Sequence, residues 1–146
     1  MDEAPKQTSA TRSRVQDATP LVLLVEDEPE VREVIRQVLE LAGFCVLECN
    51  GPRQALKLAD EHRDVQLLLS DVVMPEMSGV DLARLLQKQH PGLVTVFMSG
   101  YSAPEAMHKE LGDSNGFHLQ KPFTMDLLLA RVAEAMQKGA AQEARV

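Results

Sequence analysis

The stretch LLLSDVVMPEMSG, residues 67–79, is an apolar run that stops abruptly on an acid, Asp71. A carboxylate buried without a partner is costly, so an acid at such a point ordinarily ends a strand and caps the following turn. Near-continuous apolar runs are typical of strands in a parallel sheet whose two faces are both covered. The chain holds four further runs of this kind, LVLLV (21–25), CVLEC (45–49), VTVFM (94–98) and FHLQ (117–120).

Segments of helical length and period separate these runs. In residues 30–42 the apolar side chains recur on one helical face, and Gly43 supplies a stop. Five alternating strand–helix pairs predict an α/β fold with a five-stranded, doubly wound parallel sheet. The other helical segments are expected after Pro52, after Gly79, from about Pro104 to Gly112 and after a Thr124 cap.

The two ends of the chain differ from its middle. Residues 1–19 are polar, mixed in charge and without periodicity, which predicts a disordered tail or linker. Order is expected from 20 to 138 as one domain. Residues 139–146 follow a glycine stop and are predicted to be a flexible tail, too short for a DNA-binding output domain.

Composition limits the classes of function. Apolar residues make up 45% of the chain and charged residues 25%, as in ordinary globular proteins. The net charge of −7, from 15 basic and 22 acidic residues, argues against binding to nucleic acid. No apolar run approaches the length of a membrane span, and no signal-peptide core is present. A cytoplasmic protein without membrane contacts is expected.

The two cysteines, Cys45 and Cys49, are four residues apart on one predicted strand. That spacing separates them by roughly 13 Å at the rise of a strand, which is too far for a disulfide. A zinc site needs more ligands, and the four histidines show no ligand spacing. Both cysteines are therefore interpreted as packing residues in a reducing compartment.

Polar residues follow four of the predicted strands. Glu26-Asp27 ends the first strand, Asp71 the third, Ser99 the fourth and Lys121 the fifth. Chemistry collects at the carboxyl ends of parallel strands, and crowded carboxylates repel one another unless a cation intervenes. Mg²⁺ suits such oxygen ligands: Asp27 and Asp71 could bind it directly, while Glu26 holds a metal-bound water. With a lysine and a hydroxyl nearby, the set favours phosphoryl transfer to a carboxylate.

Four motifs in this order and spacing, VEDEP, LLLSDVVMPEMSG, VFMSGY and LQKPF, resemble the response-regulator receiver domains of two-component signalling. The resemblance covers about residues 20–138, and FMSGY and FHLQKPF are most similar to receivers that belong to, or serve, hybrid histidine kinases. It implies a flavodoxin-like (βα)5 fold with strand order 2-1-3-4-5.

The same resemblance implies a set of roles. Asp71 would be phosphorylated by a histidine kinase or a histidine phosphotransfer protein of a phosphorelay. Output would be altered protein binding by the face made of the fourth helix, the fifth strand and the fifth helix. The remaining roles are Mg²⁺ or Mn²⁺ binding by Glu26, Asp27, Asp71 and the Val73 carbonyl, phosphoryl contacts from Ser99 and Lys121, and a cis peptide at Lys121-Pro122.

The sequence departs from the common pattern of this family at three points. The acidic pair is Glu-Asp where two aspartates are usual, and Ser99-Gly100 stands where Thr-Ala is frequent. His118 occupies the switch position, where Tyr or Phe is common; it is equally consistent with a switch and with a surface residue of an edge strand. Val73 and Tyr101 flank the site at the positions that tune hydrolysis, and their types predict slow autodephosphorylation.

Two other functions fit the residues of this site less well. An aspartate-nucleophile phosphatase needs a second Asp two residues after the nucleophile, where this chain has Val73, which cannot transfer a proton. A degenerate receiver that never takes phosphate is not supported, since all five site residues are present. A signalling module with self-catalysed phosphotransfer, and not an enzyme, is expected. Whether it is a stand-alone regulator or a receiver from a longer kinase stays open.

Overall fold

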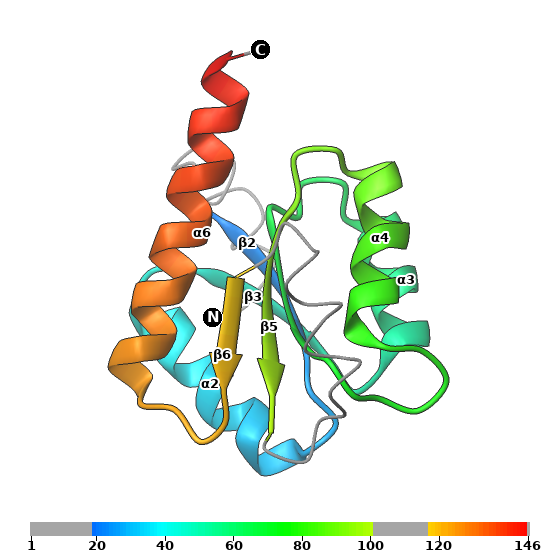
Figure 1. Cartoon of the computed structure of the whole chain (residues 1–146), viewed down its shortest axis with the longest axis vertical. Helices are drawn as coiled ribbons and strands as arrows, with labels where there is room; N and C mark the ends of the chain where they lie inside the picture. Colours follow the sequence, from blue (N-terminus) through cyan, green and yellow to red (C-terminus); the bar gives the residue numbers. More distant parts are fainter. Residues whose placement is uncertain (1–18, 101–116, 146) are drawn as a thin grey trace, which may run out of the picture.

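The computed structural model describes residues 19–100 and 117–145. Within them lies one parallel sheet of five strands in the spatial order β3-β2-β4-β5-β6 (Figure 1). Counted along the chain this is order 2-1-3-4-5, as the family resemblance implied. The strands are β2 (Leu21–Val25), β3 (Cys45–Cys49), β4 (Leu67–Asp71), β5 (Val94–Ser99) and β6 (Phe117–Gln120).

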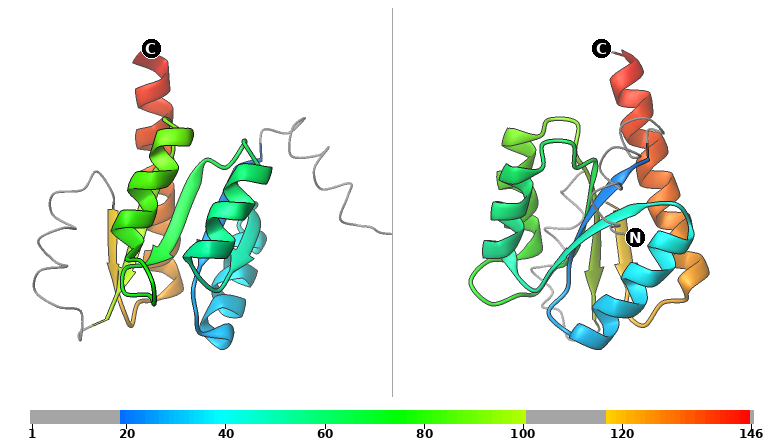
Figure 2. Two further views of the ribbon diagram at one scale, coloured as in Figure 1. Left: turned by 90° about the vertical axis from the view of Figure 1, so that its right-hand side faces the viewer. Right: turned by 180° about the vertical axis from the view of Figure 1, so that it is seen from behind.

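Four described helices cover the two faces of the sheet (Figures 1 and 2). They are α2 (Pro29–Leu41), α3 (Pro52–Glu61), α4 (Gly79–Gln89) and α6 (Met125–Arg145). Side chains of α3 and α4 pack into one buried cluster, and those of α2 and α6 into the other. Successive residues of β2 alternate between the clusters, so Leu23 faces α3 and α4 while Leu24 faces α2 and α6. Two buried faces therefore explain why the strands are apolar throughout.

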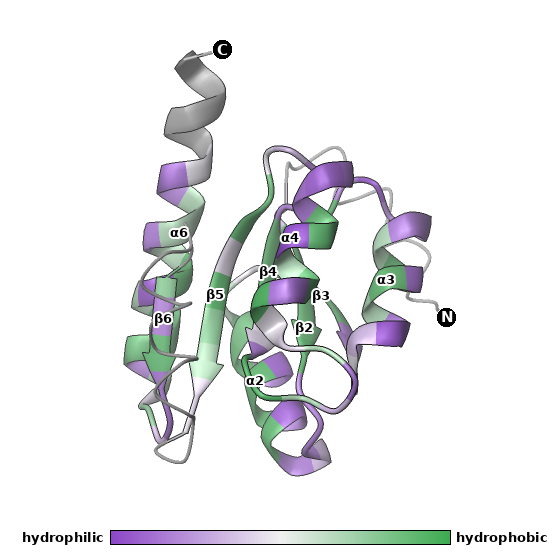
Figure 3. Ribbon diagram, turned by 45° about the vertical axis from the view of Figure 1, so that its right-hand side comes forward, coloured by the Kyte–Doolittle hydropathy of each residue, from purple (hydrophilic) through white to green (hydrophobic). Residues whose placement is uncertain are grey.

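The hydropathy colouring shows the same division of roles (Figure 3). The central strands are mostly hydrophobic, whereas the helices carry both hydrophobic and hydrophilic residues. Ile35 and Leu39 of α2 are buried against the sheet, and the Arg36 side chain of the same helix pairs with Glu33 and Glu40 of α2 and with Glu48 of β3. Such amphipathic helices are stabilised by packing on the sheet more than by their own propensity.

Local signals in the sequence set several helix boundaries. Proline occupies the first turn of α2 and α3, where its missing N–H is not needed. Ser78 caps α4 by accepting a hydrogen bond from the Asp81 amide at 3.1 Å. The predicted Thr124 cap is confirmed, because its hydroxyl accepts from the Leu127 amide at 3.1 Å. Gly43 follows α2 with φ of 100°, a conformation that favours glycine.

The glycine stop expected at Gly139 does not end the last helix. Helix α6 continues through Gly139 to Arg145 and extends beyond the rest of the domain (Figure 1). Alanine, glutamine and glutamate follow the glycine, and their high helix propensity outweighs a glycine cost of about 1 kcal/mol. None of the helices in the described part of the chain is both long and apolar enough to cross a bilayer.

Two predicted segments fall outside the described residues. They are the helix expected near Pro104–Gly112 and the tail of residues 1–19, apart from its last residue. Both cysteines are described and both carry free thiols. Burial raises the pKa of the Cys49 thiol to about 11, which suits a packing role because the thiolate is the reactive form.

Candidate metal and phosphoacceptor site

The predicted site residues lie at one edge of the sheet because all five strands run in the same direction. Val25 pairs with Ser70, so Glu26 and Asp71 follow on neighbouring strands. Asp71 in turn pairs with Met98, which places Ser99 one residue further along β5. Lys121 comes directly after β6, and its amide donates to the Ser99 carbonyl at 2.7 Å. The register therefore brings together residues that are up to 95 positions apart in the chain.

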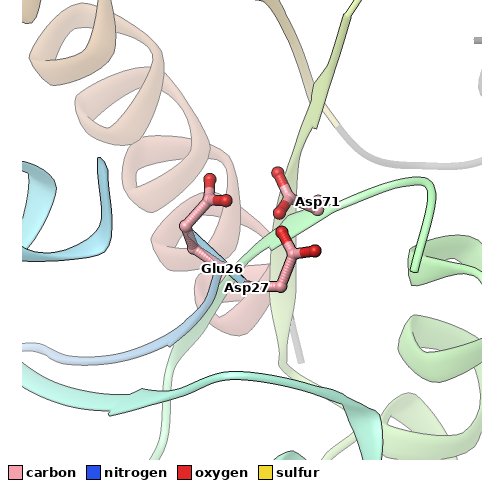
Figure 4. Close-up of side chains that lie close together, drawn as sticks. All are labelled: Glu26, Asp27 and Asp71. Atoms are coloured by element: carbon pink, nitrogen blue, oxygen red, sulfur yellow. The ribbon is translucent and has the colours of Figure 1, made fainter. Parts of the chain in front are cut away.

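Three acidic side chains converge at this edge (Figure 4). Glu26, Asp27 and Asp71 each offer a carboxylate oxygen within 4.8 Å of the others. Glu26 is fully buried and Asp71 is 5% exposed, whereas Asp27 is exposed. The donor set contains only oxygen, and the exposed Asp27 leaves the group open to solvent. Both features suit a hard divalent cation such as Mg²⁺, which keeps several waters.

Lys121 supplies the positive charge next to these acids. Its Nζ lies 2.8 Å from Glu26 Oε1 and 2.8 Å from Asp71 Oδ1. Burial opposes the charge of Lys121, but the hydrogen bonds and charges of Asp71 and Glu26 outweigh burial and raise the pKa of the amine. Lys121 is therefore held as a cation between the two buried carboxylates.

The pKa of the Asp71 carboxyl is raised in this environment. Burial raises its pKa to about 7, and the neighbouring Glu26 acts in the same direction, while Lys121 opposes the shift. The charge of Lys121 thus offsets only part of the effect of burial and of Glu26 on the pKa of Asp71. A divalent cation beside the carboxylates would favour the ionised form of Asp71, which is the form that can act as a nucleophile.

Two hydrogen bonds hold Glu26 in place, one to its side chain and one to its main chain. The Glu28 amide donates to Glu26 Oε2 at 3.1 Å. Arg32 Nη1 donates to the Glu26 carbonyl at 2.8 Å, and its Nε donates to Glu48 Oε1 at 3.2 Å. Sequence reasoning missed Arg32. Its available signal was a basic side chain in the first turn of a helix, where acidic residues are favoured.

Gly79 allows α4 to begin directly against the end of β4. Its amide donates to the Val72 carbonyl at 2.7 Å, and an added Cβ would lie 2.1 Å from the Asp71 carbonyl oxygen. The Ser70 hydroxyl donates to that same oxygen at 2.9 Å. Only a residue without a side chain fits here, so Gly79 is a supporting residue that sequence reasoning also missed.

The Ser99 hydroxyl contacts His118. Ser99 is 3% exposed, and its Oγ lies 2.5 Å from His118 Nε2 in a shared hydrogen bond. The ring of His118 therefore turns toward the site residue on β5, which speaks against a purely solvent-facing edge residue. Its role as a switch stays a prediction. The Lys121-Pro122 peptide is cis, as the family resemblance implied.

The predicted roles of Val73 and Tyr101 are not tested by contacts in the structure. Val73 lies in the loop after β4 with its side chain 54% exposed, and metal binding by its carbonyl stays a prediction. Tyr101, the other residue predicted to tune hydrolysis, lies outside the described residues.

Comparison with known proteins identifies the family. The family model of the response regulator receiver domain matches residues 22–133. This chain is a member of the receiver family. Receivers bind Mg²⁺ at an acidic pocket, and this receiver has an acidic group of Glu26, Asp27 and Asp71 at the edge of its sheet.

Curated relatives place the receiver within two-component signalling. The sensor kinase CckA of Brucella abortus (strain 2308) is 39% identical over 144 residues, which are 94% of this chain but 15% of the kinase. The response regulator receiver protein CpdR of the same organism is 30% identical over 115 residues, 79% of this chain and 95% of CpdR. This receiver thus spans only a small part of the first relative and nearly the whole of the second.

Solved structures agree on the fold. A response regulator receiver domain protein from Clostridium thermocellum superposes with a TM-score of 0.77 at 22% identity, over 84% of this chain and 98% of that chain. A signal receiver domain of an HD domain-containing protein from Pseudomonas fluorescens Pf-5 gives 0.78 at 21% identity, over 88% and 94%. At these identities the likeness supports the fold alone.

Proposed function

We propose that Asp71 of this receiver accepts a phosphoryl group from a phosphohistidine, carried by a histidine kinase or a histidine phosphotransfer protein. The observation that carries the proposal is the position of Asp71 between a lysine amine 2.8 Å away and an oxygen-only acidic group that suits Mg²⁺. A nucleophilic carboxylate with cationic groups on its sides is the arrangement that phosphoryl transfer requires.

The proposed reaction has a simple balance of bonds. A carboxylate oxygen of Asp71 attacks phosphorus, the P–N bond of the phosphohistidine breaks, and the donor imidazole leaves with the bonding electron pair and takes a proton from solvent. Mg²⁺, when bound, supplies positive charge to the phosphoryl oxygens. Lys121 pairs with another of these oxygens, and Glu26 and Asp27 are the residues that would hold the cation.

The surface next to the site suits a protein as the donor. A cavity of about 640 Å³ adjoins Lys121 and is mostly apolar. Val34 lines this cavity and is 48% exposed, so its apolar side chain is accessible to a partner. A partner that places phosphohistidine at Asp71 would cover this surface at the same time, and the buried apolar area would stabilise the complex. The other residues that line the cavity are Glu30, Val31, Ile35, Gly100, Pro122, Phe123 and Met125.

The proposed output is a change in protein binding and not catalysis on a substrate. Ser99 moves toward the phosphoryl group, and the face predicted from the sequence repacks; it comprises β6, α6 and the fourth predicted helix, which lies outside the described residues. With acidic residues in excess, 22 against 15, binding to nucleic acid is not expected. Val73, which offers no hydrogen bond to an attacking water, and Tyr101 together favour slow loss of the phosphoryl group.

A small phosphodonor and intact mass measurement test the proposal. The receiver is incubated with acetyl phosphate or phosphoramidate in the presence of Mg²⁺, and a mass gain of one phosphoryl group is expected. The gain should be absent in excess chelator and in Asp71→Asn. Asp60→Asn, which removes an exposed acid on α3, serves as a matched control and should behave like the parent. An unchanged mass gain in Asp71→Asn would overturn the assignment.

A further inference from the structure

We propose that Arg32 is a positioning residue for the cation site. Through the Glu26 carbonyl it sets the direction of the Asp27 carboxylate, and thereby the affinity of the receiver for a divalent cation. The inference rests on the proposed function, because it takes the acidic group of Glu26, Asp27 and Asp71 to hold Mg²⁺. It extends that function by giving a role to a side chain outside the acidic group.

The Asp27 side chain is the least restrained of the three acids. Glu26 and Asp71 are buried, and each lies 2.8 Å from the Lys121 amine. Asp27 is exposed, and within residues 19–100 and 117–145 no hydrogen bond or ion pair holds its carboxylate. One of its oxygens nevertheless lies within 4.8 Å of an oxygen from each of the other two acids (Figure 4). The direction of this carboxylate must therefore come from the main chain that carries it.

The peptide group between Glu26 and Asp27 determines that direction. A peptide group is planar, so a hydrogen bond to its carbonyl oxygen restrains the whole plane, including the bond that leads into the next residue. Arg32 Nη1 donates to the Glu26 carbonyl at 2.8 Å. On the other side of the residue, the Glu26 amide donates to the Cys49 carbonyl at 3.1 Å. The main chain that enters Asp27 is thus restrained by a side chain from α2.

The burial of Glu26 makes this hydrogen bond costly to lose. Glu26 is fully buried, and a buried carbonyl without a donor lacks the hydrogen bond that water gives it in the unfolded chain. When the Arg32 side chain is shortened, the peptide plane gains free energy by turning toward water or another donor. Asp27 is joined to that plane, so its carboxylate turns with it.

The Arg32 guanidinium is itself held by the neighbouring strand β3. Its Nε donates to Glu48 Oε1 at 3.2 Å, and Arg36 Nε lies 3.1 Å from the second oxygen, Glu48 Oε2. Leu24 pairs with Glu48 across β2 and β3, so the Glu48 carboxylate lies two residues before Glu26 in the register. The planar guanidinium bridges the Glu48 carboxylate and the Glu26 carbonyl with two nitrogens, which the single ammonium group of a lysine cannot do.

Positioning and charge predict opposite effects of losing Arg32. Arg32 lies in the first turn of α2, where the helix dipole disfavours a cation, so its place there depends on its tertiary contacts. If Arg32 acted only as a positive charge beside the site, its removal would strengthen cation binding by Coulomb's law. If it orients Asp27, its removal weakens cation binding. The sign of the change in affinity therefore distinguishes the two roles.

The test measures the affinity of the full chain for Mn²⁺ by electron paramagnetic resonance, in which the signal of free Mn²⁺ falls as the ion binds, with Mg²⁺ as competitor. Replacing a residue that orients metal ligands typically costs about 10- to 100-fold in affinity, so Arg32→Gln should bind about 10-fold more weakly than the parent. Arg32→Lys keeps the charge and one donor and should lose less.

Arg36→Gln is the matched control. It removes the same charge from the same helix, and the partners of Arg36 in the described part of the chain are Glu33, Glu40 and Glu48, without the Glu26 carbonyl. Surface charges are screened by salt, so its affinity for Mn²⁺ should stay within about twofold of the parent.

A double-mutant cycle separates positioning from a general loss of structure. Glu48→Gln should weaken Mn²⁺ binding about 3-fold in the parent and have no such effect in Arg32→Gln, because Glu48 acts through Arg32. Urea unfolding in excess chelator measures the stability of each variant without metal. A role in stability alone would lower the unfolding midpoint of Arg32→Gln and leave its Mn²⁺ affinity unchanged.

Mn²⁺ binding by Arg32→Gln that equals or exceeds that of the parent overturns the proposal, as does an equal loss in Arg36→Gln or an additive cycle. If Arg32→Gln does not fold, Arg32→Lys is compared with Arg36→Lys: weaker binding in the first alone supports the proposal, and equal affinities overturn it. Absence of Mn²⁺ and Mg²⁺ binding in the folded parent would instead overturn the cation site of the proposed function.

Discussion

Replacing Asp71 with asparagine should make the metal-free receiver more stable at alkaline pH, although it removes the proposed phosphoacceptor. Burial raises the pKa of Asp71 from 3.8 to about 7, so ionising this carboxyl in the folded protein is unfavourable. Asparagine resembles the neutral acid and avoids that cost. The expected gain runs opposite to the usual destabilisation that a buried substitution causes.

The magnitude follows from the shift. About three pKa units, at about 1.36 kcal/mol per unit, correspond to about 4 kcal/mol in the free energy of unfolding. The ionisation of Asp71 depends on the charges of Glu26 and Lys121, which can adjust and lower the cost of ionising Asp71. A gain of about 1–3 kcal/mol in the free energy of unfolding is therefore expected. Between about pH 4 and pH 7 the folded state binds more protons than the unfolded state, so the stability of the parent falls as pH rises through this window.

Urea unfolding in excess chelator, at about pH 5 and about pH 8, measures the effect. The advantage of Asp71→Asn should be largest at the higher pH and shrink at the lower one. Added Mg²⁺ should stabilise the parent and not the variant, because the cation binds the folded carboxylates. Asp27→Asn is the matched control: it removes an exposed acid of the same group, so it should lose the Mg²⁺ effect without gaining stability. Equal stability of parent and Asp71→Asn in chelator at both pH values would refute the reasoning.

Three further substitutions test the neighbouring structure. Gly79→Ala places a Cβ 2.1 Å from the Asp71 carbonyl oxygen, so it should cost about 1–3 kcal/mol in unfolding experiments and slow phosphorylation. Gly51→Ala, whose Cβ meets nothing within 4 Å, changes only the N-cap of α3 and should leave phosphorylation unchanged. His90→Leu should stabilise the fold by about 1 kcal/mol in the same experiments, because neither buried ring nitrogen has a partner among the described residues. Val73→Asn should speed the loss of phosphoryl from Asp71, measured by intact mass over time; an unchanged rate would show that water access is set elsewhere.

The composition of the site was largely predictable from the sequence, because parallel strands end at one edge of a sheet. Once five apolar runs alternate with helical segments, residues that follow the runs must meet at that edge, and Glu26, Asp27, Asp71 and Lys121 do so. The helix end near Gly43 and the Thr124 cap were also predictable, because each depends only on one residue and its immediate neighbours in the chain.

The supporting contacts were not predictable. Arg32 reaches back to the Glu26 carbonyl, and Gly79 packs against the Asp71 carbonyl, through approaches that depend on how helices sit on the sheet. The helix beyond Lys138 was missed because a single glycine is a weak stop when strong helix formers follow it.

The sequence by itself therefore determined the α/β class, the strand order through its family resemblance, and the list of residues at the active edge. Periodicity shows which side chains are buried, and this pattern defines the strands and helices. The alternation of strands with helices then makes the strands parallel. Tertiary structure alone decided that Lys121 bridges Glu26 and Asp71, and that His118 turns toward Ser99. Those contacts depend on strand register and rotamers, which are set by packing across the sheet and leave no periodic trace in the chain.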